Sequence, residues 1–288
     1  MANSQESKSL DLIEQLRKHN VIDLTIVPNP DSLIYFNDGE SVPVTFFPDK
    51  FIGRNVLFNQ NFEPCLSRMI CHLVNQLGLT NLSLFDVGAN IGIFSRQIKN
   101  QLGDRLVTIN AFEPSPDNFS LLEVNLGFIP GVVLHEYGLS DEDATIELNM
   151  DSMNTGNYSF LKSAVTEEEF GGVQQAEVRN GCDVIREISK NLPGPYIYKS
   201  DTQGFDQFIA CTFDLSFWDK VSIAVFELWR LPSPKQYDVE KFKKILSSFD
   251  NLRFVGKSNA FISVEDVIEY LSHTDYAHDD LIAWNNQR

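Results

Sequence analysis

Residues 85–96 read FDVGANIGIFSR and place an acidic residue, two glycines and an asparagine in the turn after an apolar run. Gly88 and Gly92 let the backbone turn sharply and approach a ligand that a Cβ would push away. The dinucleotide fingerprint GxGxxG needs a glycine where this chain has Asp86, and a carboxylate there would oppose a pyrophosphate at close range. The turn therefore favours a ligand with a positive charge, such as a sulfonium nucleoside, over a dinucleotide.

A second acidic residue follows at the distance typical of a ribose ligand. Glu113 ends the next apolar run, in NAFEPSPDNF, and nucleotide sites place the acid that contacts ribose hydroxyls at about this distance. An ionised carboxylate can accept hydrogen bonds from both hydroxyls of an unphosphorylated ribose. A third run ends in HEYGLSDED, where an adenine could lie against Gly138, Leu139 and Ser140. Asp86 and Glu113 together predict a nucleoside without a pyrophosphate.

From residue 82 onward, short apolar runs alternate with helical patterns. The stretches after Asn90 and after Ser115 predict helices, and Ser115 is suited to cap the second one, with Pro116 at its first position. The predicted strands are LSLFDV, LVTINAFE, VVLHEYGL, YIYKSD and VSIAVFEL, with LRFVG and DLIAWN as a terminal antiparallel hairpin around the helix VEDVIEYL. This alternation predicts a parallel sheet covered on both faces, in which ligands bind beyond the carboxyl ends of the strands.

The first 80 residues predict an N-terminal extension of mixed α and β structure. SLDLIEQLRKHN has apolar residues at helical spacing, and SLIYFNDGESVPVTFF predicts a β-hairpin around an Asn-Asp-Gly-Glu turn. NFEPCLSRMICHLVNQLGL predicts a helix that ends at Gly78. We therefore expect a helix, a hairpin and a helix in residues 1–80, followed by one α/β domain in residues 81–288.

These motifs, in this order and spacing, resemble a known family. FDVGANIGIFS, AFEPSPDNFSLLEVN, GLSDED, YKSDTQGFD and VFEL are similar to the FkbM-type family of S-adenosylmethionine-dependent methyltransferases, over roughly residues 82–230. The resemblance implies the class I methyltransferase fold, which is Rossmann-like, with a seven-stranded, mostly parallel sheet, helices on both faces and an antiparallel last strand. It also implies S-adenosylmethionine as the cofactor and O-methylation of a hydroxyl on a sugar, a glycan or a glycosylated natural product.

The resemblance assigns site residues as well. It makes the turn after the first strand the loop for the methionine and adenosine parts of the cofactor, with Glu113 as the ribose ligand. Asp201 corresponds to the family's acid at the end of the fourth strand, which faces the methyl group and the acceptor. The expected cofactor-binding residues are Asp86, Gly88, Asn90, Ile91, Gly92, Glu113, Pro114, Leu139 and Ser140.

One motif departs from the family pattern. The family usually has glutamate at the positions of Gln203 and Asp206 in YKSDTQGFD, whereas Lys199 and Asp201 match. If a glutamate there helps to hold a metal or a proton, this chain lacks that group. Gln203 therefore keeps an alternative open, in which the domain binds the nucleoside without catalysis and its acceptor site has degenerated.

Methyl transfer from a sulfonium to oxygen is an in-line displacement, so catalysis depends chiefly on aligning acceptor oxygen, methyl carbon and sulfur. A sugar hydroxyl must also lose its proton, which calls for a base or a divalent metal. Asp201 is the first candidate base. His273, in LSHTDYAHDDL, is the second, because this fold places that connection at the mouth of the site. The same segment holds His278, Asp275 and Asp279 and could supply a base or metal ligands, with a solvated loop as the alternative.

The polar segment MDSMNTGNYSFLKSAVTEEEFGGVQQ, residues 150–175, separates the third strand from the fourth. Long loops in compact domains are commonly lids or disordered insertions. We expect a lid over the acceptor that contributes Asn154, Asn157 or Tyr158.

Composition limits the classes of partner. The 288 residues carry a formal net charge of −17 and are 43% hydrophobic, which is ordinary for a globular protein. A nucleic-acid surface normally needs an excess of Lys and Arg, so we expect no nucleic acid as partner. The N-terminal residues do not read as a secretory signal, no apolar run reaches the length of a membrane span, and the four cysteines contain no CxxC pair. We therefore expect a cytoplasmic protein that acts on a small-molecule or glycan acceptor.

Overall fold

The computed structural model describes residues 63–286, apart from residues 153, 163–164, 193, 232–235, 258–259, 274 and 276. Before residue 63 it describes three short strands and Ile52. The chain divides into two compact units, Met1–Phe62 and Glu63–Arg288. The boundary thus falls between Phe62 and Glu63, whereas the sequence led us to expect it near residue 80.

The N-terminal unit contains a three-stranded antiparallel sheet. Strands β1 (Thr25–Ile26), β2 (Ile34–Phe36) and β3 (Val44–Phe46) lie in that order. Ile34 pairs with Phe46, which confirms the expected hairpin. The residues of its turn and the helix expected in SLDLIEQLRKHN lie outside the described residues.

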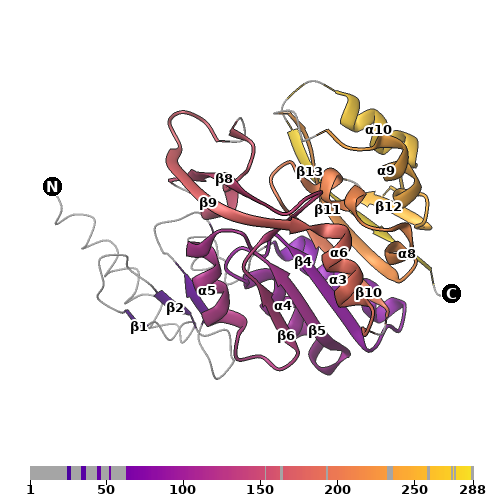
Figure 1. Ribbon diagram of the computed structural model, residues 1–288. Coiled ribbons are helices and arrows are strands. Elements are labelled where there is room, and N and C mark those ends of the chain that lie inside the picture. The colour runs from indigo at the N-terminus through magenta and orange to yellow at the C-terminus, as the bar shows by residue number, and fades with distance from the viewer. Residues whose placement is uncertain are drawn as a thin grey trace. The chain divides into compact units, whose positions relative to one another are not determined.

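The second unit is built on a seven-stranded sheet (Figure 1). In spatial order its strands are β12 (Asn251–Phe254), β13 (Ala277–Trp284), β11 (Val221–Leu231), β10 (Tyr196–Ser200), β4 (Leu82–Val87), β5 (Leu106–Phe112) and β6 (Val132–His135). Only β13 runs antiparallel to its neighbours in this sheet. This strand order with a single reversed strand is the class I methyltransferase fold, as expected.

Alternating side chains divide the core between the two faces of the sheet. Leu82 and Leu84 pack with the helices of one face, whereas Phe85 and Val87 pack with those of the other, because successive side chains of a strand point to opposite faces. The first face is covered by α3 (Pro64–Gln76), α4 (Ile93–Leu102) and α5 (Pro116–Leu126). The second is covered by α6 (Gly181–Ser189), α7 (Asp206–Thr212), α8 (Leu215–Trp218), α9 (Val239–Leu246) and α10 (Val264–Ser272).

Helix α3 explains the shifted boundary. Its apolar stripe, which includes Leu66, Ile70 and Leu73, is buried in the same cluster as the sheet residues Leu82 and Leu84. An amphipathic helix buries its apolar stripe against the core that it stabilises. Helix α3 therefore belongs to the α/β unit and not to the N-terminal extension.

The expected start of α5 is confirmed. The Ser115 side chain accepts a hydrogen bond from the backbone N–H of Asn118 at 3.4 Å, and Pro116 occupies the first turn. Helix α10, which the sequence also predicted, begins with a capping box formed by Ser263 and Asp266. Such caps satisfy backbone N–H groups that have no partner within the helix.

The segment after β6 differs from the expectation. We expected one strand through residue 139 and a loop over residues 150–175, but the chain leaves the main sheet after His135. Strands β7 (Gly138–Ser140), β8 (Ala144–Asp151) and β9 (Phe170–Asn180) form a separate sheet in the order β7-β9-β8. In Figure 1, β8 and β9 form an extended hairpin beside the main sheet. Glycines and polar residues obscured the period-two alternation in this hairpin. The expected loop is thus reduced to the hairpin tip between β8 and β9 (152–169), whose described residues include a short 3-10 helix at Thr155–Asn157.

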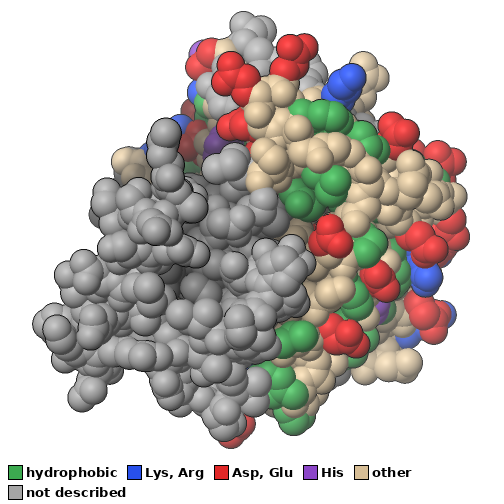
Figure 2. All heavy atoms as spheres, turned by 90° about the vertical axis from the view of Figure 1, so that its left-hand side faces the viewer, with side chains coloured by type: hydrophobic (Ala, Val, Ile, Leu, Met, Phe, Trp, Pro, Cys, Tyr) green, Lys and Arg blue, Asp and Glu red, His purple; other side chains and the backbone are tan. Residues whose placement is uncertain are grey.

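The surface of the α/β unit is acidic. Figure 2 shows Asp and Glu side chains spread over the described part of one face, with fewer Lys and Arg between them. Within the described ranges, no helix has the length and apolar character needed to cross a membrane.

Candidate cofactor and acceptor site

The turn after β4 packs directly against the end of β10. Gly88 has φ +79°, and a Cβ on it would lie 2.0 Å from the backbone oxygen of Asp201. The Asp201 N–H also donates to the carbonyl of Val87 at 3.0 Å. Gly92 has φ +82°, and a Cβ there would meet Leu122 of α5 at 2.8 Å. Close packing therefore requires glycine at both positions. Strands β4 and β10 meet where the strand order reverses, which is where α/β sheets bind ligands.

Asp86, the last but one residue of β4, is fully buried. Its Oδ2 accepts a hydrogen bond from Ser95 Oγ at 2.6 Å, and its Oδ1 lies 3.7 Å from Lys199 Nζ. Burial raises the pKa of Asp86, while Lys199 and Ser95 oppose the shift. Among the described residues, Oδ1 has no hydrogen-bond partner. An unsatisfied buried acceptor is costly, so this oxygen favours a ligand that carries a donor.

Glu113 follows β5 and holds the neighbouring turn in place. Its Oε2 accepts the backbone N–H of Asn90 at 2.9 Å, and its Oε1 accepts that of Ser115 at 2.9 Å. Burial raises its pKa to about 7, opposed by the hydrogen bonds from Ser115 and Asn90. Each carboxylate oxygen has more than one lone-pair site, so both can still accept a ribose hydroxyl.

The remaining expected cofactor residues lie around these two acids. Ile91 is buried, and its carbonyl accepts a hydrogen bond from Asn125 Nδ2 at 2.7 Å. Leu139 and Ser140 are buried in β7, which pairs with β9 and not with the main sheet. Pro114 lies beside β7, since a Cβ added to Gly138 would be 3.4 Å from the Cβ of Pro114. The structure thus brings Pro114 to the strand where an adenine was expected, and its contact with a ligand stays a prediction.

Lys199 connects the cofactor turn to the expected acceptor side. Its side chain is 4% exposed and lies between Asp86 and Asp201, 3.5 Å from Asp201 Oδ2. Although burial opposes its charge, Asp201, Asp86 and Glu63 raise its pKa. The Asp201 side chain is 22% exposed, so it is the more accessible end of this chain of charges.

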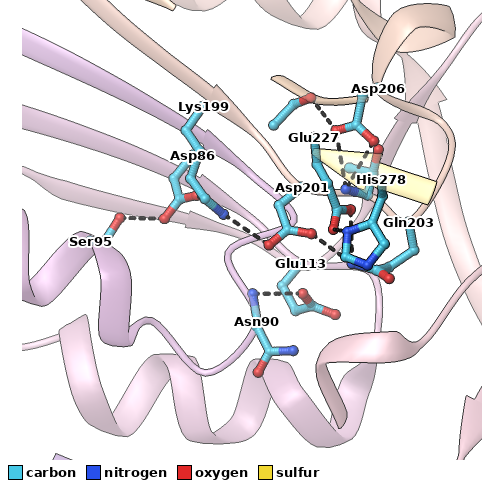
Figure 3. A network of polar contacts seen from close by, with 12 residues as sticks. Asp86, Asn90, Ser95, Glu113, Lys199, Asp201, Gln203, Asp206, Glu227 and His278 are labelled. Carbon is cyan, nitrogen blue, oxygen red and sulfur yellow. Dashed lines mark hydrogen bonds and ion pairs between the residues drawn. The ribbon is translucent and has the colours of Figure 1, made fainter. Parts of the chain in front are cut away.

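A second set of polar contacts continues from Asp201 across β11 to β13 (Figure 3). Gln203 Nε2 donates to Asp201 Oδ1 at 2.8 Å and to Glu227 Oε2 at 2.9 Å. His278 Nδ1 lies 3.3 Å from Glu227 Oε1. Glu227 had no predicted role, although it lies in the VFEL motif, and Gln203 was notable from the sequence only as a departure from the family pattern.

His273 lies outside this set of contacts. It is exposed at the carboxyl end of α10. Asp275 pairs with Arg230 at 3.1 Å, and Asp279 pairs with Lys257. His278 is thus the histidine of this segment that reaches Glu227, and a catalytic role for His273 stays a prediction.

The polar residues of the site lie on the same face of the sheet as one half of the apolar core. Alternate residues of a strand share one face of the sheet. On the α3–α5 face, the side chains of each strand are apolar in the core and charged near the carboxyl ends of the parallel strands. The series are Leu82, Leu84 and Asp86; Ile197, Lys199 and Asp201; Ile223, Val225 and Glu227; and, on the reversed strand, Trp284, Ile282, Asp280 and His278. The fold therefore gathers these charges at one end of one face.

Most of these groups are carboxylates. Burial raises the pKa of Glu63, Asp206 and Glu227, and neighbouring acids raise them further. Burial and Asp201 raise the pKa of Asp280 to about 6. Lys199 lies among several acidic groups, an arrangement that suits a cationic ligand better than an anionic one. Within the described ranges, no group of three or more histidine, cysteine or acidic side chains is arranged to hold a metal ion.

The β8–β9 hairpin reaches both sides of the site. Ser159 Oγ donates to the carbonyl of Gln203 at 3.0 Å, and Ser115 Oγ donates to Gln174 of β9 at 3.0 Å. Burial raises the pKa of Tyr158 to about 12, and the negative charges of Asp117, Asp151 and Glu113 add to the shift. The hairpin therefore contacts the cofactor side at Ser115 and the acceptor side at Gln203.

Comparison with known proteins relates the chain to methyltransferases. No protein-family model matches it. It is 28% identical over 161 residues to Methyltransferase 1 of Beauveria bassiana (strain ARSEF 2860), a match that covers 50% of this chain and 64% of that protein. It is 28% identical over 176 residues to Methyltransferase sdnD of Sordaria araneosa, covering 52% of this chain and 67% of that protein. The crystal structure of methyltransferase FkbM from Methylobacillus flagellatus KT matches 79% of this chain and 50% of its own, at 14% identity and a TM-score of 0.41.

The two sequence similarities agree with the class that the strand order defines. The chain has the class I methyltransferase fold and is similar in sequence to two curated methyltransferases. The chain spans less than two thirds of the length of Methyltransferase 1, at 64%.

Proposed function

We propose that this protein is an S-adenosylmethionine-dependent O-methyltransferase of the FkbM type, and that its acceptor is a hydroxyl on a sugar, a glycan or a glycosylated natural product. The observation that carries the proposal is the pair of buried carboxylates, Asp86 and Glu113, at adjacent strand ends beside a glycine turn. Asp86 opposes a pyrophosphate and suits a cationic ligand, and Glu113 suits the hydroxyls of an unphosphorylated ribose. The motif order and the curated relatives support the same class.

The residues present fit this cofactor. Asp86 Oδ1 is buried without a hydrogen bond among the described residues, so it can receive a donor such as an ammonium group. Glu113 can accept ribose hydroxyls while it holds the N–H groups of Asn90 and Ser115. When bound, S-adenosylmethionine would supply an electrophilic methyl group on a sulfonium. The protein's task is then to orient the acceptor oxygen, to exclude water and to remove the hydroxyl proton.

A transfer assay tests the proposal. The protein is incubated with S-adenosylmethionine that is tritiated in its methyl group, with methyl α-D-glucopyranoside and methyl α-L-rhamnopyranoside as hydroxyl probes and methylamine as an amine probe. We expect label in the glycosides and stoichiometric S-adenosylhomocysteine. Label in methylamine alone would contradict O-methylation of sugars.

A second candidate, a nucleoside-binding domain without catalysis, is favoured by Gln203. Its amide donates to both Asp201 and Glu227 and so engages both carboxylates of the acceptor side. The variant Asp201→Ala separates the two candidates. A methyltransferase should lose turnover and keep its affinity for S-adenosylhomocysteine, whereas a binding domain binds this nucleoside and transfers no methyl group to any probe.

Cofactor affinity is expected to depend on pH through Glu113. Its pKa is raised to about 7, and a carboxylate accepts hydrogen bonds better than a carboxylic acid. Because only the ionised form is suited to the ribose, affinity for S-adenosylhomocysteine should rise about eightfold from pH 6 to pH 7.5. Calorimetry at the two pH values measures it. Glu113→Gln is the control, because its side chain does not ionise. If the affinity of this variant changed with pH as much as that of the wild-type protein, titration of the ligand or of another group would be the cause, which would contradict the assignment to Glu113.

The hairpin tip is expected to become protected when the cofactor binds. Lys162 is the basic residue of the described tip and is exposed, so trypsin can cut after it. Ser159 and Gln174 link the hairpin to both sides of the site, and saturating S-adenosylhomocysteine should slow this cleavage at least about threefold by removing open conformations. Mass spectrometry follows the cut, with cleavage after Lys190 on the far face as the control. Equal rates with and without ligand would contradict the lid.

A further inference from the structure

Four side chains form a continuous series of contacts across three neighbouring strand ends. Asp201 follows β10, Gln203 lies in the next turn, and Glu227 and His278 lie on β11 and β13. The successive distances are 2.8 Å, 2.9 Å and 3.3 Å. In Figure 3 the His278 ring lies beside Glu227 and Gln203, on the opposite side of Asp201 from Lys199.

The two strands fix the position of His278 relative to Glu227. Glu227 is directly opposite Asp280, and Trp229 is directly opposite His278 in the antiparallel pair. Glu227 and His278 are therefore diagonal neighbours on one face, within reach of each other. The imidazole stacks on the buried Trp229 ring, with centroids 5.1 Å apart and an interplanar angle of 20°. Trp229 sets the plane of the ring, and Glu227 sets which nitrogen faces inward.

Gln203 sets the position of Glu227. Gln203 has φ +52°, a left-handed conformation that is uncommon for this residue type. Ser159 Oγ holds its carbonyl at 3.0 Å. The two N–H bonds of its amide are directed at two different carboxylates, so Glu227 Oε2 is engaged while Oε1 faces His278. Backbone strain of this kind persists where the surrounding structure holds it, commonly at functional sites.

Asp201, the expected base, has both oxygens engaged by the protein. Oδ1 accepts from Gln203, and Oδ2 faces Lys199 at 3.5 Å. These contacts make Asp201 an anchor for Lys199 and Gln203, and its side chain is 22% exposed, against 49% for that of His278. His278 has a side chain that is 49% exposed, whereas that of Glu227 is 10% exposed. Solvent or an acceptor therefore reaches the imidazole more readily than it reaches the carboxylate.

We propose that His278 is the base that removes the acceptor's hydroxyl proton and that Glu227 is the positioning residue that orients it; this inference rests on the proposed methyltransferase function. Glu227 accepts the Nδ1–H of the neutral ring, which leaves the electron pair of Nε2 directed away from Glu227. A carboxylate that fixes the tautomer of a catalytic imidazole in this way is a recurring arrangement. The distance of 3.3 Å is typical of catalytic pairs that tighten when substrate binds.

The transfer step balances with His278 as the proton acceptor. As the hydroxyl oxygen forms its bond to the methyl carbon, the carbon–sulfur bond breaks and its electron pair remains on sulfur. The hydroxyl proton passes to Nε2 of His278, and the resulting imidazolium is stabilised by Glu227. The proton leaves to solvent through the exposed edge of the ring.

Two measurements on the full chain test the assignment without an acceptor. Long-range proton–nitrogen correlation spectra of protein labelled with ¹⁵N-histidine report which ring nitrogen carries the proton. The signal of His278 is identified by its loss in His278→Gln. At pH 8 we expect the Nδ1–H tautomer in the wild-type protein and in the control Glu269→Gln, which changes an exposed acid on α10. In Glu227→Gln we expect loss of that preference in favour of Nε2–H.

The second measurement is carbethoxylation by diethyl pyrocarbonate, which attacks an unprotonated imidazole nitrogen. We expect His278 to react within about fivefold of the rate of exposed His273, the internal reference. An Nε2–H tautomer in the wild-type protein, or an unreactive His278, would overturn the proposal. Calorimetry with S-adenosylhomocysteine on the same samples distinguishes failure of this proposal from failure of the proposed function. Absence of binding would contradict the proposed function, whichever tautomer His278 adopts.

Discussion

Replacing Glu113 by alanine is expected to weaken binding of S-adenosylmethionine at least about 100-fold. Hydrogen bonds to a charged group contribute about 1.5–3 kcal/mol each, so loss of two ribose contacts corresponds to roughly this factor. The substitution also removes the acceptor of the Asn90 and Ser115 N–H groups. The cofactor turn is then less well held, which adds to the loss.

Calorimetry at pH 8, above the pKa of about 7 for Glu113, measures this effect in its simplest form. Glu113→Gln keeps the volume and one carbonyl acceptor and should give an intermediate loss. Glu123→Ala removes an exposed acid of α5 and serves as the matched control. If folded Glu113→Ala protein bound the cofactor as tightly as the control, Glu113 could not be the ribose ligand.

Replacing Gly88 by alanine is expected to be among the most destabilising single changes in the α/β unit. A Cβ at this position would lie 2.0 Å from the backbone oxygen of Asp201. The clash is with main chain, so relief requires β4 and β10 to separate at the centre of the sheet. A left-handed backbone alone costs a Cβ-bearing residue about 1–2 kcal/mol, and we expect a total loss of about 4 kcal/mol or more.

Gly256 provides a matched control for this substitution. It has the same φ of +79°, and a Cβ there would meet nothing within 4 Å. Gly256→Ala should therefore cost only the backbone conformation, about 1 kcal/mol. Urea unfolding of both variants gives the difference in free energy of unfolding. Equal losses would show that the close approach of the two strand ends is not what requires glycine at position 88.

The cofactor half of the site was predictable because its residues directly follow apolar runs. Asp86 and Glu113 stand at the ends of strands that are buried over most of their length. Parallel strands bring their carboxyl ends to the same edge of a sheet, so local patterns suffice to place both residues together. The same reasoning placed Asp201 beyond β10.

The acceptor half depended on pairings that are distant in sequence. Glu227 and His278 lie within strands that continue past the core, so no turn signal marks them. Their proximity follows from the register of β11 and β13, which a single sequence does not reveal. Gln203 joins the site through a left-handed turn and through Ser159 of the hairpin tip. The hairpin itself was missed because glycine and polar residues obscured its alternation.

The most direct test of the central claim is calorimetric titration of the purified protein with S-adenosylmethionine, S-adenosylhomocysteine and NAD. Glu113 should hold the ribose of both sulfur nucleosides, and Asp86 should exclude the pyrophosphate of NAD. We expect saturable binding of both sulfur nucleosides at a single site and no binding of NAD. Binding of NAD without binding of either sulfur nucleoside would contradict the assignment of the site and the function proposed from it.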